Sequence, residues 1–194
     1  MPSSAASGSL EFYKTRFDIE NALTRNVLKV LPPDKLDYRP HERSPSTGQI
    51  AWTILRGLFI RIDMASRGAS DVLLESHPGF EEILDRFEDA SRRHAGQLET
   101  WPEAAWEKIG HLRSGGHVAL ERPAGDIVWL FHFDEIHHRG QLSTYLRPMG
   151  AKVPSIYGAS GRKNPVLRPL FPAKSLRCAI EEFAAFLIQS LGGD

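Results

Sequence analysis

The sequence predicts an all-α protein: a four-helix bundle with a long connection before the fourth helix and an extra helix near the C-terminus. Four stretches place apolar residues at helical spacing, and segments rich in Pro and Gly separate them. The length of 194 residues, with 41% hydrophobic and 25% charged side chains, suits one soluble core. We therefore expect a flexible tail over residues 1–9 and the bundle over 10–158. A C-terminal extension over 159–194 should pack on the bundle or on a partner subunit.

The first two predicted helices have clear ends. Residues 10–31 carry an apolar stripe, and Ser9 before them is a suitable N-cap. Pro33 ends this helix because it lacks the amide donor that the next turn needs. The second helix opens with the spacing of a capping box, in which Ser46 and Gln49 each bind the other's backbone amide.

The third helix is predicted to start near Pro78, and its apolar stripe includes an inward-facing imidazole, His94. The helical pattern breaks down over residues 100–125, where Gly115-Gly116 signals a turn. We interpret this stretch as a long connection that holds a short helix and a strand or hairpin. The extra C-terminal helix is predicted over residues 173–191, with one apolar side that must be buried.

The fourth helix, residues 126–147, carries the candidate chemistry. Phe131, Asp134, His138 and Leu142 share one stripe, which we expect to face the bundle interior. A buried carboxylate is costly unless it is paired, hydrogen-bonded or bound to a metal. Asp134 and His138 are four residues apart, a spacing that lets both side chains bind one ion. Bundles place metal sites in their core from facing helices.

The composition argues against several classes of partner. Lys plus Arg and Asp plus Glu each number 24, so no net positive charge favours nucleic acid, and no basic stripe is present. No apolar run approaches the roughly 20 residues that span a membrane. The first nine residues lack the basic start and apolar centre of a signal peptide, and the single Cys178 fits a reducing compartment. We expect a cytoplasmic protein with no nucleic-acid or membrane partner.

Three motifs together resemble a known family. They are His137-His138-Arg139-Gly140-Gln141-Leu142, Gly48-Gln49-Ile50-Ala51-Trp52 and Leu31-Pro32-Pro33-Asp34-Lys35-Leu36. The sequence is similar in these motifs to the DinB-like family, the DinB/YfiT superfamily of proposed metalloenzymes. The resemblance implies an up-down-down-up bundle, often a homodimer, with a divalent metal held by three histidines. It also implies relatives that use low-molecular-weight thiols such as glutathione, mycothiol or bacillithiol.

Two of the three histidine positions are substituted in this sequence. The histidine that the resemblance implies on the second helix is replaced by Thr53, and the first one on the fourth helix by Asp134; only His138 remains. A carboxylate is a competent ligand, but a neutral hydroxyl is a poor one for zinc or nickel. The predicted metal ligands are therefore His138, Asp134 and, weakly, Thr53. His94 is a candidate substitute for the missing imidazole.

The substituted histidine positions leave two candidate functions. The first is a metal-dependent enzyme of unknown substrate, a thiol-dependent transferase or a hydrolase, in which Asp134 or Glu135 accepts a proton. The second is a non-catalytic helical dimer or a small-ligand-binding protein that has lost the metal. Structural interpretations stand beside both: Asp134 pairs with His138, His94 is a core histidine, and Glu135 and Arg139 form a surface ion pair.

Overall fold

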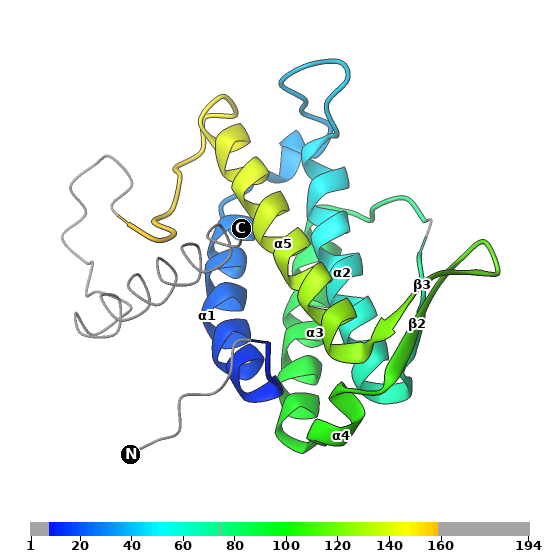
Figure 1. Ribbon diagram of the computed structural model, residues 1–194. Helices are drawn as coiled ribbons and strands as arrows, with labels where there is room; N and C mark the ends of the chain where they lie inside the picture. The colour runs from blue at the N-terminus through cyan, green and yellow to red at the C-terminus, as the bar shows by residue number, and fades with distance from the viewer. Residues whose placement is uncertain (1–7, 74, 159–194) are drawn as a thin grey trace, which may run out of the picture. The chain divides into compact units, whose positions relative to one another are not determined.

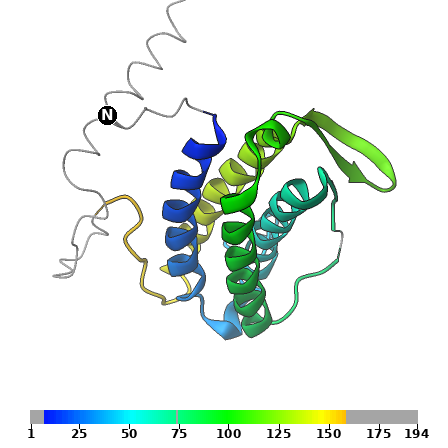
Figure 2. The same ribbon diagram turned by 90° about the horizontal axis from the view of Figure 1, so that it is seen from below.

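The computed structural model describes residues 8–73 and 75–158. The chain divides into two compact units, Met1–Pro154 and Ser155–Asp194, and every element below belongs to the first. Its long helices lie side by side as a bundle (Figures 1 and 2). They are α1 (Leu10–Leu28), α2 (Thr47–Arg67), α3 (Phe80–Thr100) and α5 (Ala124–Leu146). The predicted helix over residues 173–191 lies outside the described residues.

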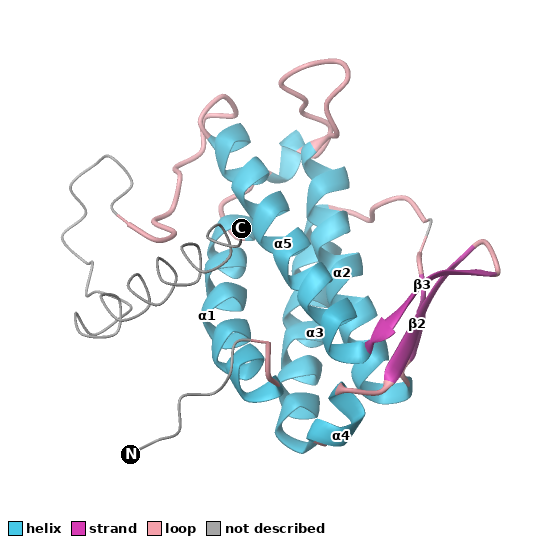
Figure 3. Ribbon diagram, viewed as in Figure 1, coloured by secondary structure: helices cyan, strands magenta, loops and turns pink. Residues whose placement is uncertain are grey.

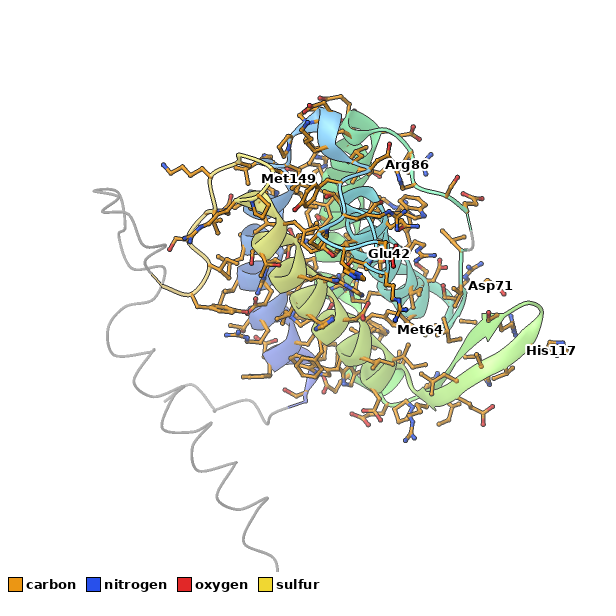
Figure 4. All side chains as sticks on the ribbon, turned by 90° about the horizontal axis from the view of Figure 1, so that it is seen from above. Glu42, Met64, Asp71, Arg86, His117 and Met149 are labelled. Atoms are coloured by element: carbon orange, nitrogen blue, oxygen red, sulfur yellow. The ribbon has the colours of Figure 1, made fainter. Side chains whose placement is uncertain are left out.

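Side-chain contacts show that the long helices form two antiparallel pairs, α1 with α3 and α2 with α5. Asn21 on α1 donates to Ser91 on α3, and one turn later Arg25 donates to Glu88, so these two helices are antiparallel. Helix α2 is antiparallel to α5. Thr47, at the start of α2, contacts Met149, which lies just beyond the end of α5. Met149 is labelled in Figure 4.

The chain also contains a sheet, so the prediction of an all-α fold is wrong. Three strands pair in the order β1-β2-β3; the strands labelled β2 and β3 are magenta beside the helices in Figure 3. Strand β1 (Ala69–Asp71) is parallel to β2 (Ile109–Ser114), which pairs with β3 (His117–Pro123) as an antiparallel hairpin. The hairpin extends away from the bundle, with His117 near its far end (Figure 4).

Local sequence explains one part of the sheet and long-range pairing explains the other. Gly115 and Gly116 have φ of 57° and 82°, the left-handed conformation that a two-residue hairpin turn needs. The hairpin and the short helix α4 (Glu103–Trp106) confirm the elements predicted in the connection. Strand β1 was not predicted because it has only three residues and gains its hydrogen bonds from β2, much later in the chain.

The core of the bundle is apolar at both ends and polar in the middle. Buried aliphatic and aromatic side chains come from all four long helices, among them Phe17, Leu55, Phe87, Val128 and Leu142. Large charged side chains are buried with them, which a core normally tolerates only when every charge is paired. No helix in the described part of the chain is both long and apolar enough to cross a membrane.

Candidate functional site

His138 and Asp134 lie together at the edge of α5. The His138 Nε2 atom is 3.4 Å from Asp134 Oδ1, and the two side chains are 21% and 37% exposed. On the other side of the ring, Nδ1 is 3.2 Å from Gln141 Oε1. Both ring nitrogens thus face oxygen acceptors. The hydrogen bond to Asp134 is the largest cause that raises the pKa of His138, and the Gln141 contact adds to it.

The third predicted ligand, Thr53, lies on helix α2. Thr53 Oγ1 donates to the Gln49 carbonyl at 2.9 Å and accepts a hydrogen bond from Arg56 Nη2 at 3.1 Å. Arg56 Nη1 also donates to the Leu73 carbonyl at 2.8 Å, so its guanidinium is held between α2 and the segment after β1. The Asp134 hydrogen bond dominates the pKa of His138, but the positive charge of Arg56 opposes it.

The antiparallel packing of α2 and α5 brings these residues to one level. An added Cβ on Gly57 would lie 3.5 Å from the Phe131 ring, so the two backbones approach closely at that point. Thr53 lies one turn before Gly57 on α2, and Asp134 lies about one turn after Phe131 on α5. Because the helices run in opposite directions, both steps lead the same way along the bundle.

A second polar group lies entirely inside the bundle. Arg61 on α2 forms a buried ion pair with Glu135 on α5, and its Nη1 atom is 3.1 Å from His132 Nδ1. Arg61 also donates to the Tyr13 hydroxyl at 3.3 Å, which is 3.0 Å from His94 Nε2. We name these five side chains, Tyr13, Arg61, His94, His132 and Glu135, the core cluster; each is 1% exposed or less.

A further buried ion pair links α1 to α5. Arg139 Nη2 lies 2.8 Å from Glu20 Oε2, and Arg139 Nη1 donates to the Glu20 carbonyl at 3.1 Å. Arg16 also pairs with the Glu20 carboxylate. The prediction of a surface pair between Glu135 and Arg139 is therefore wrong, because each is buried and bonded to a different helix.

The residues of α5 that face inward are only partly the ones predicted. Val128, His132, Glu135, Arg139 and Leu142 are buried, whereas Asp134 and His138 lie partly in solvent at the edge of that face. The difference has a physical cause. Burial of His132, Glu135 and Arg139 depends on partners from α1 and α2, which the pattern of one helix does not contain. Glu135 was predicted as a candidate proton acceptor, but it is buried and paired with Arg61.

Burial controls the protonation of the core cluster. Desolvation, with the nearby Arg61 charge, lowers the pKa of His94 to about 3 and that of His132 to about 2. Desolvation also raises the pKa of Tyr13 to about 12, against the opposing Arg61 charge. Both histidines are consequently neutral in the folded protein at neutral pH.

We name Thr53 and Arg56 on α2 with Asp134, His138 and Gln141 on α5 the edge site; these residues do not fit a tightly held transition metal. His138 Nε2 faces Asp134 and Nδ1 faces Gln141, so a metal would have to displace one of these contacts and bind a deprotonated ring nitrogen. The Thr53 oxygen accepts from a guanidinium, whose charge repels a cation. His94 bonds Tyr13 inside the bundle. Over the described ranges, 8–73 and 75–158, no three His, Cys, Asp or Glu side chains come together as a metal site.

Arg56, Arg61 and Gln141 were not among the site residues predicted from the sequence. Arg61 carried a usable signal, because an arginine between Ile60 and Ile62 in the middle of a long helix interrupts an otherwise apolar segment. Arg56 and Gln141 carried a weaker signal, because polar residues at such positions are ordinary on a helix surface. Each lies three residues from a predicted site residue on its own helix, Arg56 from Thr53 and Gln141 from His138, and contacts it there.

One family model matches most of the chain. The family model described as DinB family matches residues 1–164. The uncharacterized protein YrdA of Bacillus subtilis (strain 168) is 24% identical over 155 residues, covering 77% of this chain and 89% of YrdA. A DinB-like protein from Bacillus cereus has a similar fold, with a TM-score of 0.65, 18% identity, and coverage of 78% of this chain and all of that one.

A mycothiol-dependent maleylpyruvate isomerase shares the fold more distantly. Its TM-score is 0.52 at 11% identity, and the match covers 69% of this chain and 60% of the isomerase. At these identities the structural likeness concerns the fold alone. The relatives of this fold thus include a thiol-dependent enzyme. The DinB family model matches residues 1–164, which is most of this chain, and the chain therefore belongs to the DinB family.

Proposed function

We propose that this chain binds a small molecule at the edge site between α2 and α5 and acts there without a resident metal ion. The observation that supports the proposal is the arrangement of His138, which has an acceptor at each ring nitrogen and remains partly open to solvent. A site residue must be reachable, and His138 and Asp134 are reachable while the core cluster is not.

The chemistry available at this site is proton transfer and hydrogen bonding. With its pKa raised chiefly by Asp134, His138 holds a proton at neutral pH more readily than a free imidazole does. When a bound molecule displaces Gln141 from Nδ1, the imidazolium can donate to that molecule. Asp134 can then hold the other side of the ring and stabilise its positive charge. This is the role of a general acid, and it requires no metal.

A second candidate function is a thiol-dependent and metal-dependent transferase or hydrolase. Two observations favour it: the fold similarity to a mycothiol-dependent isomerase, and the spacing of Asp134 and His138. In that case a divalent ion would have to displace the proton on His138 and overcome the charge of Arg56. Zinc or nickel would then bind weakly and compete with protons.

Metal binding separates the two candidates. Protein purified without a histidine tag should contain less than one zinc or nickel per chain, and calorimetric titration with zinc should show no site that His138→Ala removes. His117→Ala, on the hairpin, is the matched control. Stoichiometric zinc binding that is lost in His138→Ala and Asp134→Asn but kept in His117→Ala would establish the second candidate instead.

Ligand binding tests the first candidate directly. A library of small organic acids, amides and thiols can be screened by the NMR signals of the His138 ring. We expect at least one class of compound to shift these signals, with binding lost in His138→Leu. If no class shifts them, while the variant melts at the same temperature as the wild type, the site is not a ligand site.

A further inference from the structure

The Arg56 guanidinium has donors to spare. It is half-buried on α2. Within the described part of the chain, its contacts with the Thr53 hydroxyl and the Leu73 carbonyl use two of its five N–H groups. Both partners are neutral oxygens, so no carboxylate neutralises this charge in either contact. A guanidinium fixed at two points but not paired with an acid is preorganised to bind an anion.

The neighbouring groups set the charge that a ligand should carry. Arg56 carries one positive charge, and its two contacts are with neutral oxygens. Asp134, the carboxylate on α5, is already in contact with His138. A single negative charge on the ligand would balance the guanidinium. A planar carboxylate matches both this charge and the fork of the guanidinium.

The position of Thr53 strengthens this assignment. Its hydroxyl donates to the Gln49 carbonyl and accepts from Arg56, so it holds the guanidinium in place rather than presenting a free lone pair to a cation. The segment after β1 holds the other end through the Leu73 carbonyl. With two fixed contacts, little side-chain entropy is lost when an anion binds.

We propose that Arg56 is the anchor for a carboxylate group, so that the ligand of the edge site is a small monocarboxylate. This inference rests on the proposed function, because it names the class of molecule that the same site takes. The carboxylate lies on Arg56, and the rest of the molecule extends toward His138. Arg56 thus determines specificity for an anion, and His138 contacts the part of the ligand next to it.

A matched pair of probes tests the charge requirement. Hexanoate and hexanamide have nearly the same shape, but only hexanoate is an anion. We expect hexanoate to shift the NMR signals of His138 with a Kd at least about tenfold lower than that of hexanamide, the ratio expected when a charge-assisted hydrogen bond replaces a neutral one. Arg56→Gln should raise the Kd for hexanoate by about tenfold or more and leave that for hexanamide unchanged.

Two control variants make the result specific. Arg67→Gln removes an exposed arginine from the same helix and should leave both Kd values unchanged. Arg56→Lys keeps the charge without the fork and should give an intermediate Kd. Melting curves establish that each variant is folded.

The two proposals fail in different ways. If both probes shift His138 equally and Arg56→Gln changes neither Kd, the site binds ligands but Arg56 is not an anion anchor. If inorganic phosphate binds more tightly than hexanoate through Arg56, the site takes an anion other than a monocarboxylate and this assignment is overturned. If neither probe nor phosphate shifts His138 at high millimolar concentration, the carboxylate inference is overturned; the library screen then decides the function alone.

Discussion

Single residues in this bundle carry charge where an apolar side chain would be expected. Arg61 and Glu135 are completely buried and pair with each other from α2 and α5. Burial of two charges costs several kcal/mol each, and their attraction compensates only while both are present. The pair is therefore far more sensitive to loss of one member than to replacement of both.

Substitution of one or both members tests this sensitivity. Glu135→Leu should lower the free energy of unfolding by about 3–5 kcal/mol, because it leaves the Arg61 charge buried without its carboxylate. Combining it with Arg61→Met should recover part of that loss. Urea unfolding measures both values, and the surface variant Arg67→Met should change stability by only about 0.5 kcal/mol. A double variant less stable than Glu135→Leu would contradict this account.

The edge site offers a gain-of-function test at the same scale. Thr53→His with Asp134→His places imidazoles at the two positions where the family resemblance implies them. We expect this variant to bind zinc, and the addition of Arg56→Ala to tighten binding because a repelling charge is removed. Thermal unfolding with and without zinc measures the change, since a ligand that binds only the folded state raises the melting temperature.

The wild-type protein and Arg56→Ala alone are the controls for that test. Neither should gain stability from zinc, because each has one imidazole at the site. If zinc stabilises the double variant no more than the wild type, Thr53, Asp134 and His138 do not converge closely enough to share an ion. That result would contradict the predicted set of metal ligands.

Sequence alone identified part of the site. Asp134 and His138 were predicted as neighbours because a helix places residues four apart on one side, and the structure confirms their contact. The direction in which that side faces was not predictable. It depends on whether Glu135 and Arg139 find buried partners, and those partners, Arg61 and Glu20, lie on other helices.

At the scale of elements, two glycines on α5 have opposite roles. An added Cβ on Gly125 would lie 2.2 Å from the Trp106 indole, whereas one on Gly140 meets nothing within 4 Å. Trp106 is buried, and its ring Nε1 donates to the Gly8 carbonyl at 3.1 Å, so it cannot easily move aside. Gly125 thus lets α4 pack against the first turn of α5.

Alanine at each position measures the two roles on one helix. Gly125→Ala should destabilise the protein by about 1–3 kcal/mol, because the indole must leave its place. Gly140→Ala should stabilise it by about 1 kcal/mol, because alanine favours the helix and its methyl group has room. Chemical unfolding gives both values. Equal effects at the two positions would show that close packing of α4 is not what requires glycine.

Local signals explain how much of the fold was predictable. The capping box at Ser46 and Gln49 is present with both of its hydrogen bonds, and Ser9 caps α1, as their spacing predicted. Such ends are encoded within four residues. Strand β1 is encoded by its pairing with β2, and no short window of sequence reports that pairing. The all-α prediction was wrong at this point.

For the whole molecule, the core cluster joins the four long helices at one place. Tyr13 comes from α1, Arg61 from α2, His94 from α3, and His132 and Glu135 from α5. Any opening of the bundle there exposes ionisable groups that the fold keeps in a fixed protonation state. Global stability should therefore depend on pH through the core cluster.

The homodimer and the domain boundaries at residues 10 and 158 stay predictions. Sedimentation can test the first, and limited proteolysis can test the second.

The pH dependence has a definite sign. Folding depresses the pKa of His94 to about 3 and that of His132 to about 2, from about 6.5 in the unfolded chain. Between those values the unfolded chain binds more protons than the folded one, so stability is full above pH 6.5 and is lost as the pH falls. Near pH 5.5, above the range of most carboxylates, two such histidines should contribute a slope of about 2.5 kcal/mol per pH unit.

Urea unfolding between pH 5 and 7 measures this slope, and histidine variants assign it. His132→Gln should reduce the slope by about half whatever it does to stability itself, because one of the two protonation sites of the unfolded chain is gone. His137→Gln, on the exposed side of the same helix, should leave the slope unchanged. An unaltered slope in His132→Gln would mean that this imidazole takes up a proton without unfolding, and hence that the core cluster opens locally to water.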